Sequence, residues 1–359
     1  MEGIKKPKLE DVARLAGVSL GSASRALSSP EAVRPATRDR VHEAAQQLGY
    51  VIQGAARALA SRRSRTIGAI LPTISNPIYA DFVQALQRTL AERGYHLLVA
   101  SHEYNLGNEV DAARGLIERG ADGLVLVGGD HDPRLGRLIE AAGIPTLAAW
   151  SFDGRNGQSS VGVSDRTGAV LATRHLLALG HRRFAVLSGP TAGNERQKAR
   201  VTGALEALAA HDVACPPEAR IEAPFSLKAG AGLIEAIRRL DHAPTAVICC
   251  SDMLAIGLVY AASRAGIAIP REMSVTGFGD VEMAGLIDPP LTTVRVPIAE
   301  IGERSARAIV ALIVGEEERI IEHVEVELLI RASTAEVTPE WHASRTHVLK
   351  REPRGEVSK

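Results

Sequence analysis

The stretch from residue 8 to residue 27, KLEDVARLAGVSLGSASRAL, constrains the fold most, because its pattern predicts two short helices joined by a tight turn. Gly17 provides the backbone freedom that the turn needs, and Val18 packs an apolar side chain beneath it. Ser19 is a good N-cap for the second helix. The expected inward face of the pair consists of Leu9, Val12, Ala13, Ala16, Ala23, Ala26 and Leu27.

The outward face of the second helix carries small residues and one arginine, namely Leu20, Gly21, Ser22, Ser24 and Arg25. Such a face suits a DNA groove, which is lined with phosphates and base edges. The alternative is a surface helical hairpin without a ligand. A third helix is expected from Arg38 to Leu48, with Thr37 as its N-cap. The sequence therefore favours a compact helix-turn-helix head that enters DNA.

Charge is divided unevenly along the chain. Residues 1 to 65 contain 12 Lys and Arg and 6 Asp and Glu. The whole chain has 42 of each kind, so the remaining residues contain 30 Lys and Arg and 36 Asp and Glu. The first part is thus net +6 and the rest net −6. A basic amino-terminal part places a phosphate-neutralising surface on one module. On charge alone, a chance fluctuation is the alternative.

Composition argues for a large folded chain in a reducing compartment. With 359 residues, 45% of them hydrophobic, the chain can fill more than one core. It has no run of 18 apolar residues and no apolar segment after its basic first residues, so we expect neither a membrane span nor a secretory signal. Cys215, Cys249 and Cys250 lack metal-ligand spacing and fit buried thiols. These features predict a cytoplasmic protein.

The body of the chain alternates apolar runs with helical patterns, which predicts an α/β fold. Helical patterns cover Ala80 to Glu92, Glu109 to Arg119 and Thr167 to Leu179. Two open α/β halves of this kind bind small ligands in a cleft at the carboxyl ends of their strands. The expected strands are 67–72, 96–100, 123–128 and 146–150 in the first half, and 184–189, 246–250 and 274–278 in the second.

Several motifs follow one another in order, among them DVARLAGVSLGSASRAL, ATRDRVHEAAQQLGY, HLLALGHRRFAVLSGP and ICCSDMLAIGLVYAASRAGIAIPREMSVTGFGD. Together they resemble the lactose-repressor/galactose-repressor (LacI-type) family of bacterial transcription regulators over residues 8 to 335. The resemblance implies a head (1–50), a hinge (51–65) and a periplasmic-binding-protein-like core of two doubly wound subdomains (66–335). That core binds an effector and dimerises, and the chain crosses between its halves near 163, 291 and 322. The polar tail, 336–359, lacks leucine heptads, which favours a dimer over a tetramer, and we expect it to be disordered.

The resemblance also implies roles in DNA binding. Leu20, Gly21 and Arg25 match the positions that read bases, and Arg25 suits a bidentate contact to guanine. In the hinge, Ala56 and Leu59 match residues that enter the minor groove and wedge open a base step. The family usually has Pro-Asn ahead of these, whereas this chain has Ile52-Gln53, so Gln53 must replace the asparagine. The phosphate-gripping positions are Ser19, Ser22, Ser24 and Ser28.

Candidate effector-binding residues lie just beyond the predicted strand ends. Arg200 matches the ligand-gripping arginine of the family in an R-x-x-G context, and Phe225 is expected to cap the pocket. Asp165 opens a helix whose amino terminus favours a carboxylate. For each of the polar residues other than Arg200, loop solvation or helix capping is an alternative role. The remaining candidates are Asn76, Tyr79, Ser251 and Asp252.

One departure from the family pattern bears on the effector. The family commonly shows Gly-aromatic-Asp-Asp after the last strand of the second half, and the first aspartate binds sugar hydroxyls. Here the run is Gly277-Phe278-Gly279-Asp280, so that carboxylate is absent. A pocket with Arg200 and without that carboxylate favours an anionic ligand. The hypothesis is a sugar acid such as gluconate, and the alternative is a bulkier neutral sugar accommodated by Gly279.

No motif indicates catalysis. The sequence lacks a Walker loop and HExxH, and no GxGxxG follows the first strand, so we expect no enzyme activity, no cofactor and no metal. The expected partners are double-stranded operator DNA, a small sugar or sugar-acid effector and a second copy of the chain. The expected function is that of a ligand-responsive transcription regulator, expected to be a repressor, that binds a near-palindromic operator as a dimer. A cytoplasmic sugar-binding protein is the alternative.

Overall fold

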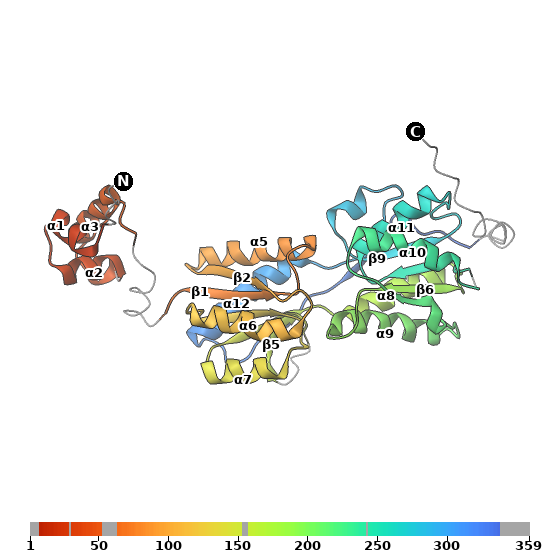
Figure 1. Cartoon of the computed structure of the whole chain (residues 1–359), viewed down its shortest axis with the longest axis horizontal. Helices are drawn as coiled ribbons and strands as arrows, with labels where there is room; N and C mark the ends of the chain where they lie inside the picture. The colour runs from red at the N-terminus through yellow and green to blue at the C-terminus, as the bar shows by residue number, and fades with distance from the viewer. Residues whose placement is uncertain (1–6, 29, 52–62, 153–156, 242, 338–359) are drawn as a thin grey trace.

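The computed structural model describes residues 7–28, 30–51, 63–152, 157–241 and 243–337. Within them the chain forms a small helical head and two α/β lobes (Figure 1). The predicted fold class is therefore confirmed. Most of the hinge, including Gln53, Ala56 and Leu59, and the tail from residue 338 lie outside the described residues. No helix in the described ranges is both long and apolar enough to cross a membrane.

The head consists of α1 (Leu9–Ala16), α2 (Leu20–Ser28) and α3 (Pro35–Leu48), with a short 3-10 turn, η1 (Pro30–Ala32). Gly17 ends α1 with a φ of 64°, as its place in the turn requires. The expectation that Thr37 caps α3 is wrong, because Pro35 starts the helix and Arg34 is its N-cap. The buried apolar residues of the head are mostly alanines: Val12, Ala13, Ala16, Ala23, Ala26, Leu27, Val41, Ala44 and Ala45.

The first lobe is a six-stranded sheet with helices on both faces (Figure 1). Its strands lie in the order β11-β5-β4-β3-β1-β2, and all of the neighbours pair in parallel. Helices α5 and α12 pack together over one face, and α6 and α7 cover the other. The bounds are β1 Thr66–Leu71, β2 His96–Ser101, β3 Gly123–Val127, β4 Thr146–Trp150, β5 Ser159–Gly162, β11 Ile321–His323, α5 Pro77–Glu92, α6 Leu106–Glu118, α7 Pro133–Ala142 and α12 Ile298–Val314.

The second lobe repeats this plan with the order β12-β10-β9-β8-β6-β7, in which only the β12–β10 pair is antiparallel among the described strands. Helices α8 and α9 pack against each other, as do α10 and α11. The bounds are β6 Phe184–Ser188, β7 Arg220–Glu222, β8 Ala246–Cys249, β9 Ser274–Gly279, β10 Thr292–Arg295, β12 Glu327–Leu329, α8 Asp165–Ala178, α9 Glu195–Ala209, α10 Leu227–Arg238, α11 Asp252–Arg264, and the 3-10 turns η3 Pro217–Ala219 and η4 Glu282–Gly285.

Three segments connect the lobes, between β5 and α8, between β10 and α12, and between β11 and β12. The first and third lie close to the expected positions 163 and 322. The second lies after residue 295 rather than near 291, because β10 still pairs with β9 in the second sheet. The carboxyl ends of β1, β4, β8 and β9 lie around one cavity between the lobes.

Candidate functional site

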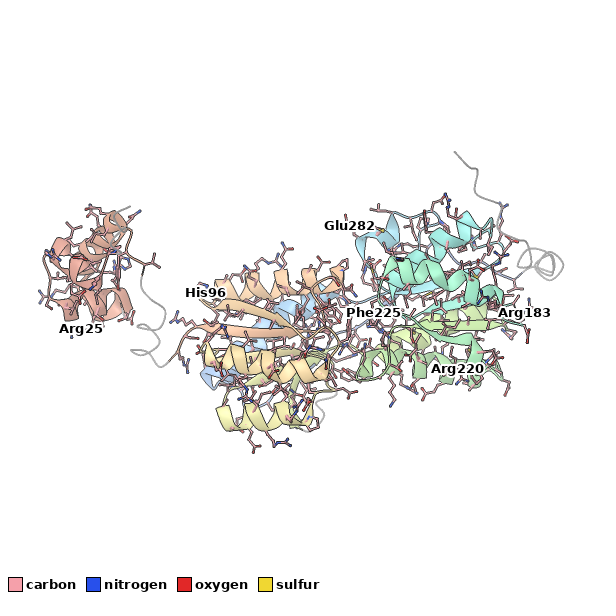
Figure 2. The ribbon with its side chains drawn as sticks, viewed as in Figure 1. Arg25, His96, Arg183, Arg220, Phe225 and Glu282 are labelled. Atoms are coloured by element: carbon pink, nitrogen blue, oxygen red, sulfur yellow. The ribbon has the colours of Figure 1, made fainter. Side chains whose placement is uncertain are left out.

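The candidate DNA-binding surface is the outward face of α2. The inward residues Ala23, Ala26 and Leu27 are buried, whereas Leu20 is 46% exposed and Arg25 is exposed on the surface of the head (Figure 2). This division is the one that the periodicity predicts. An apolar side chain such as Leu20 lying in solvent is a candidate for contact with an apolar group of a partner.

The hydroxyl groups on α2 hold their own helix in the structure. Ser19 Oγ accepts the N–H of Ser22 at 3.2 Å and thus caps the helix, as predicted. Ser28 Oγ donates to the carbonyl of Ser24 at 2.8 Å. The guanidinium of Arg25 donates through Nε to the Gly21 carbonyl at 3.2 Å. In this structure these side chains are therefore oriented by contacts within their own helix.

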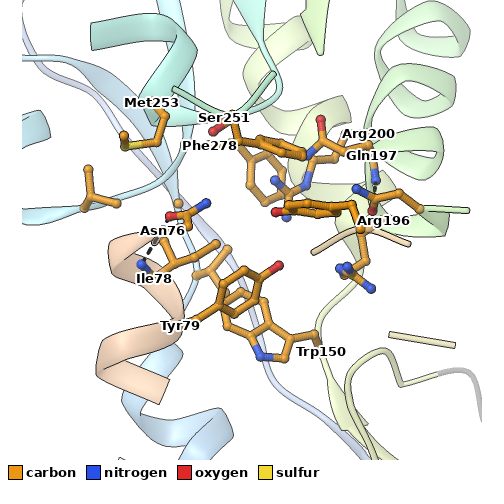
Figure 3. A pocket seen from close by; sticks show the side chains of 16 residues that line it. Asn76, Ile78, Tyr79, Trp150, Arg196, Gln197, Arg200, Ser251, Met253 and Phe278 are labelled. Carbon is orange, nitrogen blue, oxygen red and sulfur yellow. Dashed lines mark hydrogen bonds between the residues drawn. The ribbon is translucent and has the colours of Figure 1, made fainter. Parts of the chain in front are cut away.

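The candidate effector site is a cavity of about 30 Å³ between the two lobes (Figure 3). Small-molecule pockets usually measure about 300–1,000 Å³. The cavity in this structure is therefore narrower than a usual small-molecule pocket, and we call this arrangement of the lobes the closed form. Five of the seven predicted residues line the cavity: Asn76, Tyr79, Arg200, Phe225 and Ser251. The other lining residues are Ile78, Tyr104, Trp150, Asn194, Arg196, Gln197, Met253, Phe278, Gly279, Val281 and Val296.

Arg200 is held on three sides at the wall of this cavity. Its Nε donates to Asp165 Oδ1 at 2.6 Å, its Nη1 donates to the Cys250 carbonyl at 2.8 Å, and its guanidinium lies 3.8 Å from the centre of the Phe278 ring. All of these partners belong to the second lobe. A buried guanidinium fixed in this way is preorganised to meet a carboxylate or a hydroxyl group.

The two predicted aspartates do not line the cavity. Asp165 accepts from Arg200 behind the wall, and burial raises the pKa of Asp165 against the opposing charge of Arg200. Asp252 accepts from Thr293 Oγ1 at 2.6 Å and from the Val281 N–H at 2.9 Å. Burial raises the pKa of Asp252 to about 6. Both carboxylates therefore position neighbouring residues in this structure, rather than facing the cavity.

Asp252 also explains the sequence around Gly279. A Cβ on Gly277 would lie 2.1 Å from Asp252 Oδ1, and one on Gly279 would lie 3.4 Å from Oδ2. Gly279 also has a φ of +136°, a conformation that side-chain-bearing residues rarely adopt. The backbone thus gives a reason for glycine at this position that is independent of the effector. The absence of a carboxylate at position 279 is thus accounted for by the fold of the second lobe, whatever the effector.

A contact between the lobes is formed by Glu195 and Arg196 of α9 against Val127, Gly128 and Gly129 after β3, and we call it the interlobe latch. The Gly129 N–H donates to Glu195 Oε1 at 2.7 Å. Arg196 Nη1 donates to the Val127 carbonyl at 3.4 Å and to Glu195 Oε1 at 3.1 Å. A Cβ on Gly128 would lie 1.8 Å from Arg196 Nη1, so only glycine allows this approach.

Electrostatics favour the charged form of the latch. Burial acts to raise the pKa of Glu195, but the charge of Arg196 and the hydrogen bond from Gly129 outweigh it, so the pKa lies below its ordinary value. Oxygen Oε2 of Glu195 is buried and has no hydrogen-bond partner among the described residues. The latch therefore holds a buried carboxylate that is incompletely satisfied, which is rare in folded proteins.

Aromatic rings from both lobes complete the cavity. Tyr104 of the first lobe and Phe225 of the second stack with their centres 5.2 Å apart and an angle of 24° between their planes. Tyr79 meets Trp150 edge to face at 5.5 Å. Trp150 has a φ of 74°, which is unusual for a bulky residue and marks a constrained position at the end of β4. Figure 3 shows Tyr79 and Trp150 at one side of the cavity and Arg200 and Phe278 at the other.

Sequence reasoning missed several lining residues for which a signal existed. Arg196 and Gln197 precede Arg200 by four and three positions, so a helix places all three on one face. That spacing was sufficient to find them. Trp150 was assigned only to a strand, and Tyr104 lies in a loop with no pattern. Their placement depends on how the two lobes meet, which the sequence pattern does not encode.

Comparison with known proteins gives consistent matches along the chain. Residues 8–53 match bacterial regulatory proteins of the lacI family, and residues 173–334 match the periplasmic binding protein-like domain. The HTH-type transcriptional regulator GntR of Pseudomonas aeruginosa is 33% identical over 317 residues, which cover 88% of this chain and 91% of the relative. The HTH-type transcriptional repressor CytR of Escherichia coli is 31% identical over 333 residues, covering 91% and 96%.

A solved structure shows the same arrangement of parts. The Lac repressor dimer bound to operator and the anti-inducer ONPF matches with a TM-score of 0.80 and 25% identity. The match covers 92% of this chain and all of that chain (100%). Head and lobes are thus both included in the similarity.

Proposed function

Because the chain belongs to the LacI family of bacterial regulatory proteins, it is a DNA-binding transcriptional regulator, and we propose that a small sugar acid bound between its lobes controls how tightly its dimer holds a near-palindromic operator. The proposed division of the chain is a head (1–50), a hinge (51–65), an effector-binding body (66–335) and a tail (336–359). Such a regulator meets its operator in the bacterial cytoplasm, and the proposed function includes no chemical step.

The proposed DNA contacts come from α2. Leu20, Gly21 and Arg25 read bases, while Ser19, Ser22, Ser24 and Ser28 contact phosphates, with Gln53, Ala56 and Leu59 of the hinge in the minor groove. The exposed Leu20 and Arg25 support this assignment. Arg25→Ala is expected to reduce discrimination at one base pair by about 1–3 kcal/mol. Binding to operators changed singly at each position measures it.

The observation that carries the sugar-acid proposal is the composition of the cavity wall. Two guanidinium groups, Arg196 and Arg200, line it, whereas no Asp or Glu does so among the described residues. Each guanidinium has one carboxylate partner set behind the wall, Glu195 or Asp165. An anionic ligand therefore meets donors without facing a carboxylate directly. The polar groups that remain for sugar hydroxyls are Asn76, Asn194, Gln197 and Ser251.

The cavity also supports control of DNA binding. Its lining comes from both lobes, so a ligand that bridges them stabilises one relative orientation over the other. Coupling of about 1–3 kcal/mol between effector and DNA corresponds to a 5–150-fold change in affinity. The direction of that change follows from which orientation the operator-bound dimer adopts.

A thermal-shift screen of the whole protein tests the effector proposal with gluconate, other sugar acids, neutral sugars and sugar phosphates. A ligand at 100 times its dissociation constant adds about 2.7 kcal/mol of stability. We expect a shift with a sugar acid and its loss in the double variant Asp165→Asn, Arg200→Gln, which removes both partners of one ion pair. A shift with a neutral sugar alone would refute the sugar acid and leave the regulator assignment intact.

A further inference from the structure

A second hollow, of about 560 Å³, lies at the other end of the first lobe, and four arginines line it: Arg63, Arg65, Arg93 and Arg307. We propose that this arginine pocket binds a small organic phosphate and is separate from the effector cleft. It is formed where β1 and β2 begin and α12 ends, near His96 in Figure 2, whereas the cleft lies at the carboxyl ends of the strands.

The arginines converge from three parts of the chain. Arg65 directly precedes β1, Arg93 precedes β2, and Arg307 projects from α12. The Arg65 backbone is fixed, since its N–H donates to Asp122 Oδ2 at 2.8 Å and its carbonyl accepts the His96 N–H at 2.8 Å. The position of the side chains around the hollow is thus set by ordered backbone at the edge of a sheet.

Existing contacts leave donor capacity on these side chains. Arg93 Nη1 lies 3.3 Å from the Thr89 carbonyl and 3.9 Å from Glu92 Oε2. Arg307 Nη2 lies 3.5 Å from Glu303 Oε2. These distances are long for charge-assisted bonds. A guanidinium carries five N–H donors, so these contacts leave Arg93 and Arg307 with donors for an anion.

Opposing charge near the hollow is limited. Glu316 is the one carboxylate in its lining, against four guanidinium groups, among the described residues. The last turn of α12 adds partial negative charge, and Arg63 Nη2 offsets part of it by donating to the Ile313 carbonyl at 3.3 Å. The hollow is therefore net positive. Arginine forks match the geometry of phosphate oxygens.

The shape favours a small organic phosphate over the backbone of a DNA duplex. Val310, Ala311 and Val314 of α12 form an apolar side of the hollow, and Tyr95 adds a ring. Apolar surface of this kind suits the carbon part of a ligand, whereas contacts to duplex phosphates are made by exposed polar side chains. Because Arg63 and Arg65 belong to the last residues of the proposed hinge, an occupant ties the end of the hinge to α12 and can thereby change the affinity for DNA.

The test is titration calorimetry of the full-length protein with pyrophosphate as the probe. We expect saturable binding, and a dissociation constant at least about tenfold higher in the double variant Arg65→Gln, Arg307→Gln, which removes two charge-assisted contacts. Arg137→Gln, an exposed arginine of α7, is the matched control and should bind as the wild type does. Equal melting temperatures of the variants establish that the exposed substitutions leave the fold intact.

Two outcomes would overturn the proposal. If the cleft variant Asp165→Asn, Arg200→Gln loses pyrophosphate binding while the pocket variant keeps it, the probe binds in the cleft. If pyrophosphate does not bind and the pocket variant lowers the salt dependence of binding to a mixed-sequence duplex, the arginines contact DNA phosphates instead. The binding of sugar acids is measured separately, so neither outcome bears on the effector proposal.

Discussion

Two ion pairs between the same two helices show how burial decides what an arginine contributes. Arg200 and Arg166 each lie 2.6 Å from a carboxylate oxygen, of Asp165 and Glu206 respectively, and each pair joins α8 to α9. The Arg200 and Asp165 side chains are only 7% and 6% exposed, whereas those of Arg166 and Glu206 are 58% and 47% exposed. Distance alone does not distinguish the pairs, but solvation does.

Arg200→Gln is therefore expected to destabilise the fold by about 3–5 kcal/mol, because it leaves the Asp165 carboxylate buried without its partner. Arg166→Gln should cost no more than about 1 kcal/mol, since water screens the exposed pair. Urea unfolding at neutral pH measures both free energies. The double variant Asp165→Asn, Arg200→Gln should recover much of the loss. Equal effects of the two single substitutions would contradict this account.

The raised pKa of Asp252 predicts that the stability of the fold depends on pH. Its pKa is about 6 in the folded protein against 3.8 for the unperturbed group, so the folded state holds a proton that the unfolded state releases. The stability that this proton contributes is present below pH 3.8 and is lost as pH rises through about 6. The total is about 3 kcal/mol, from a shift of about two pKa units.

Asp252→Asn removes this titration. The unfolding free energy of the variant relative to the wild type should therefore rise between pH 4 and pH 7.5 by about 3 kcal/mol at most. Urea unfolding at both pH values gives the difference, and any constant cost of placing an amide beside the Val281 N–H cancels in the comparison. A difference that does not change with pH would show that Asp252 is ionised throughout.

At the residue scale, the resemblance to the LacI family predicted Arg200, whose R-x-x-G context matches the ligand-gripping arginine of that family. It predicted Asp165 and Asp252 at the right strand ends but not the direction that their side chains take. That direction depends on Thr293, Val281 and Arg200, which come from distant parts of the chain. The local sequence predicts that a residue lies near the site, but tertiary packing decides whether its side chain lines the cavity or pairs with residues behind the lining.

At the scale of elements, the latch links the start of α9 to the loop after β3. Glu195→Ala removes the acceptor of the Gly129 N–H, a charge-assisted hydrogen bond worth about 1.5–3 kcal/mol. The population of the closed form relative to the open form should fall by about 10–100-fold. Small-angle scattering without ligand should then report a larger radius of gyration.

Glu206→Ala is the control for the latch, because Glu206 lies on the same helix but is exposed and pairs within the second lobe. Its scattering curve should match that of the wild type. Gly128→Ala should open the cleft as Glu195→Ala does, since its Cβ would overlap Arg196. Unchanged scattering from both of these variants would show that the latch does not hold the lobes together.

The sequence predicted long elements better than short ones. The seven predicted strands all appear, with ends shifted by a residue or so, because each is an apolar run in a largely parallel sheet, and all but the edge strand β2 are buried. Strands β7, β11 and β12 have three residues each, too few to show a period. These short strands lie at sheet edges, and their pairing with distant strands is what defines them.

At the scale of the whole molecule, the proposed dimer requires surface that a single chain leaves uncovered. The second lobe has a hollow of about 620 Å³ along α10 and α11, next to η4. Leu227, Tyr260 and Met283 line it, and Tyr260 is 64% exposed. In the first lobe, β2 forms a sheet edge with Val99 exposed. Exposed apolar side chains gathered around one hollow make this surface a candidate for the interface between two copies.

Tyr260→Asp places a charge within this surface and should weaken self-association by about 2 kcal/mol or more, which is roughly a thirtyfold rise in the dimer dissociation constant. Ile330→Asp, an equally exposed apolar position of the same lobe outside the hollow, is the matched control. Sedimentation velocity over a concentration series measures both. The two heads of one dimer bind two half-sites together, so a variant that dimerises less should also bind the operator more weakly. Its operator affinity should recover at protein concentrations high enough to restore the dimer. If Tyr260→Asp remains a dimer with normal operator affinity, the copies associate through another surface, and the β2 edge of the first lobe becomes the next one to test.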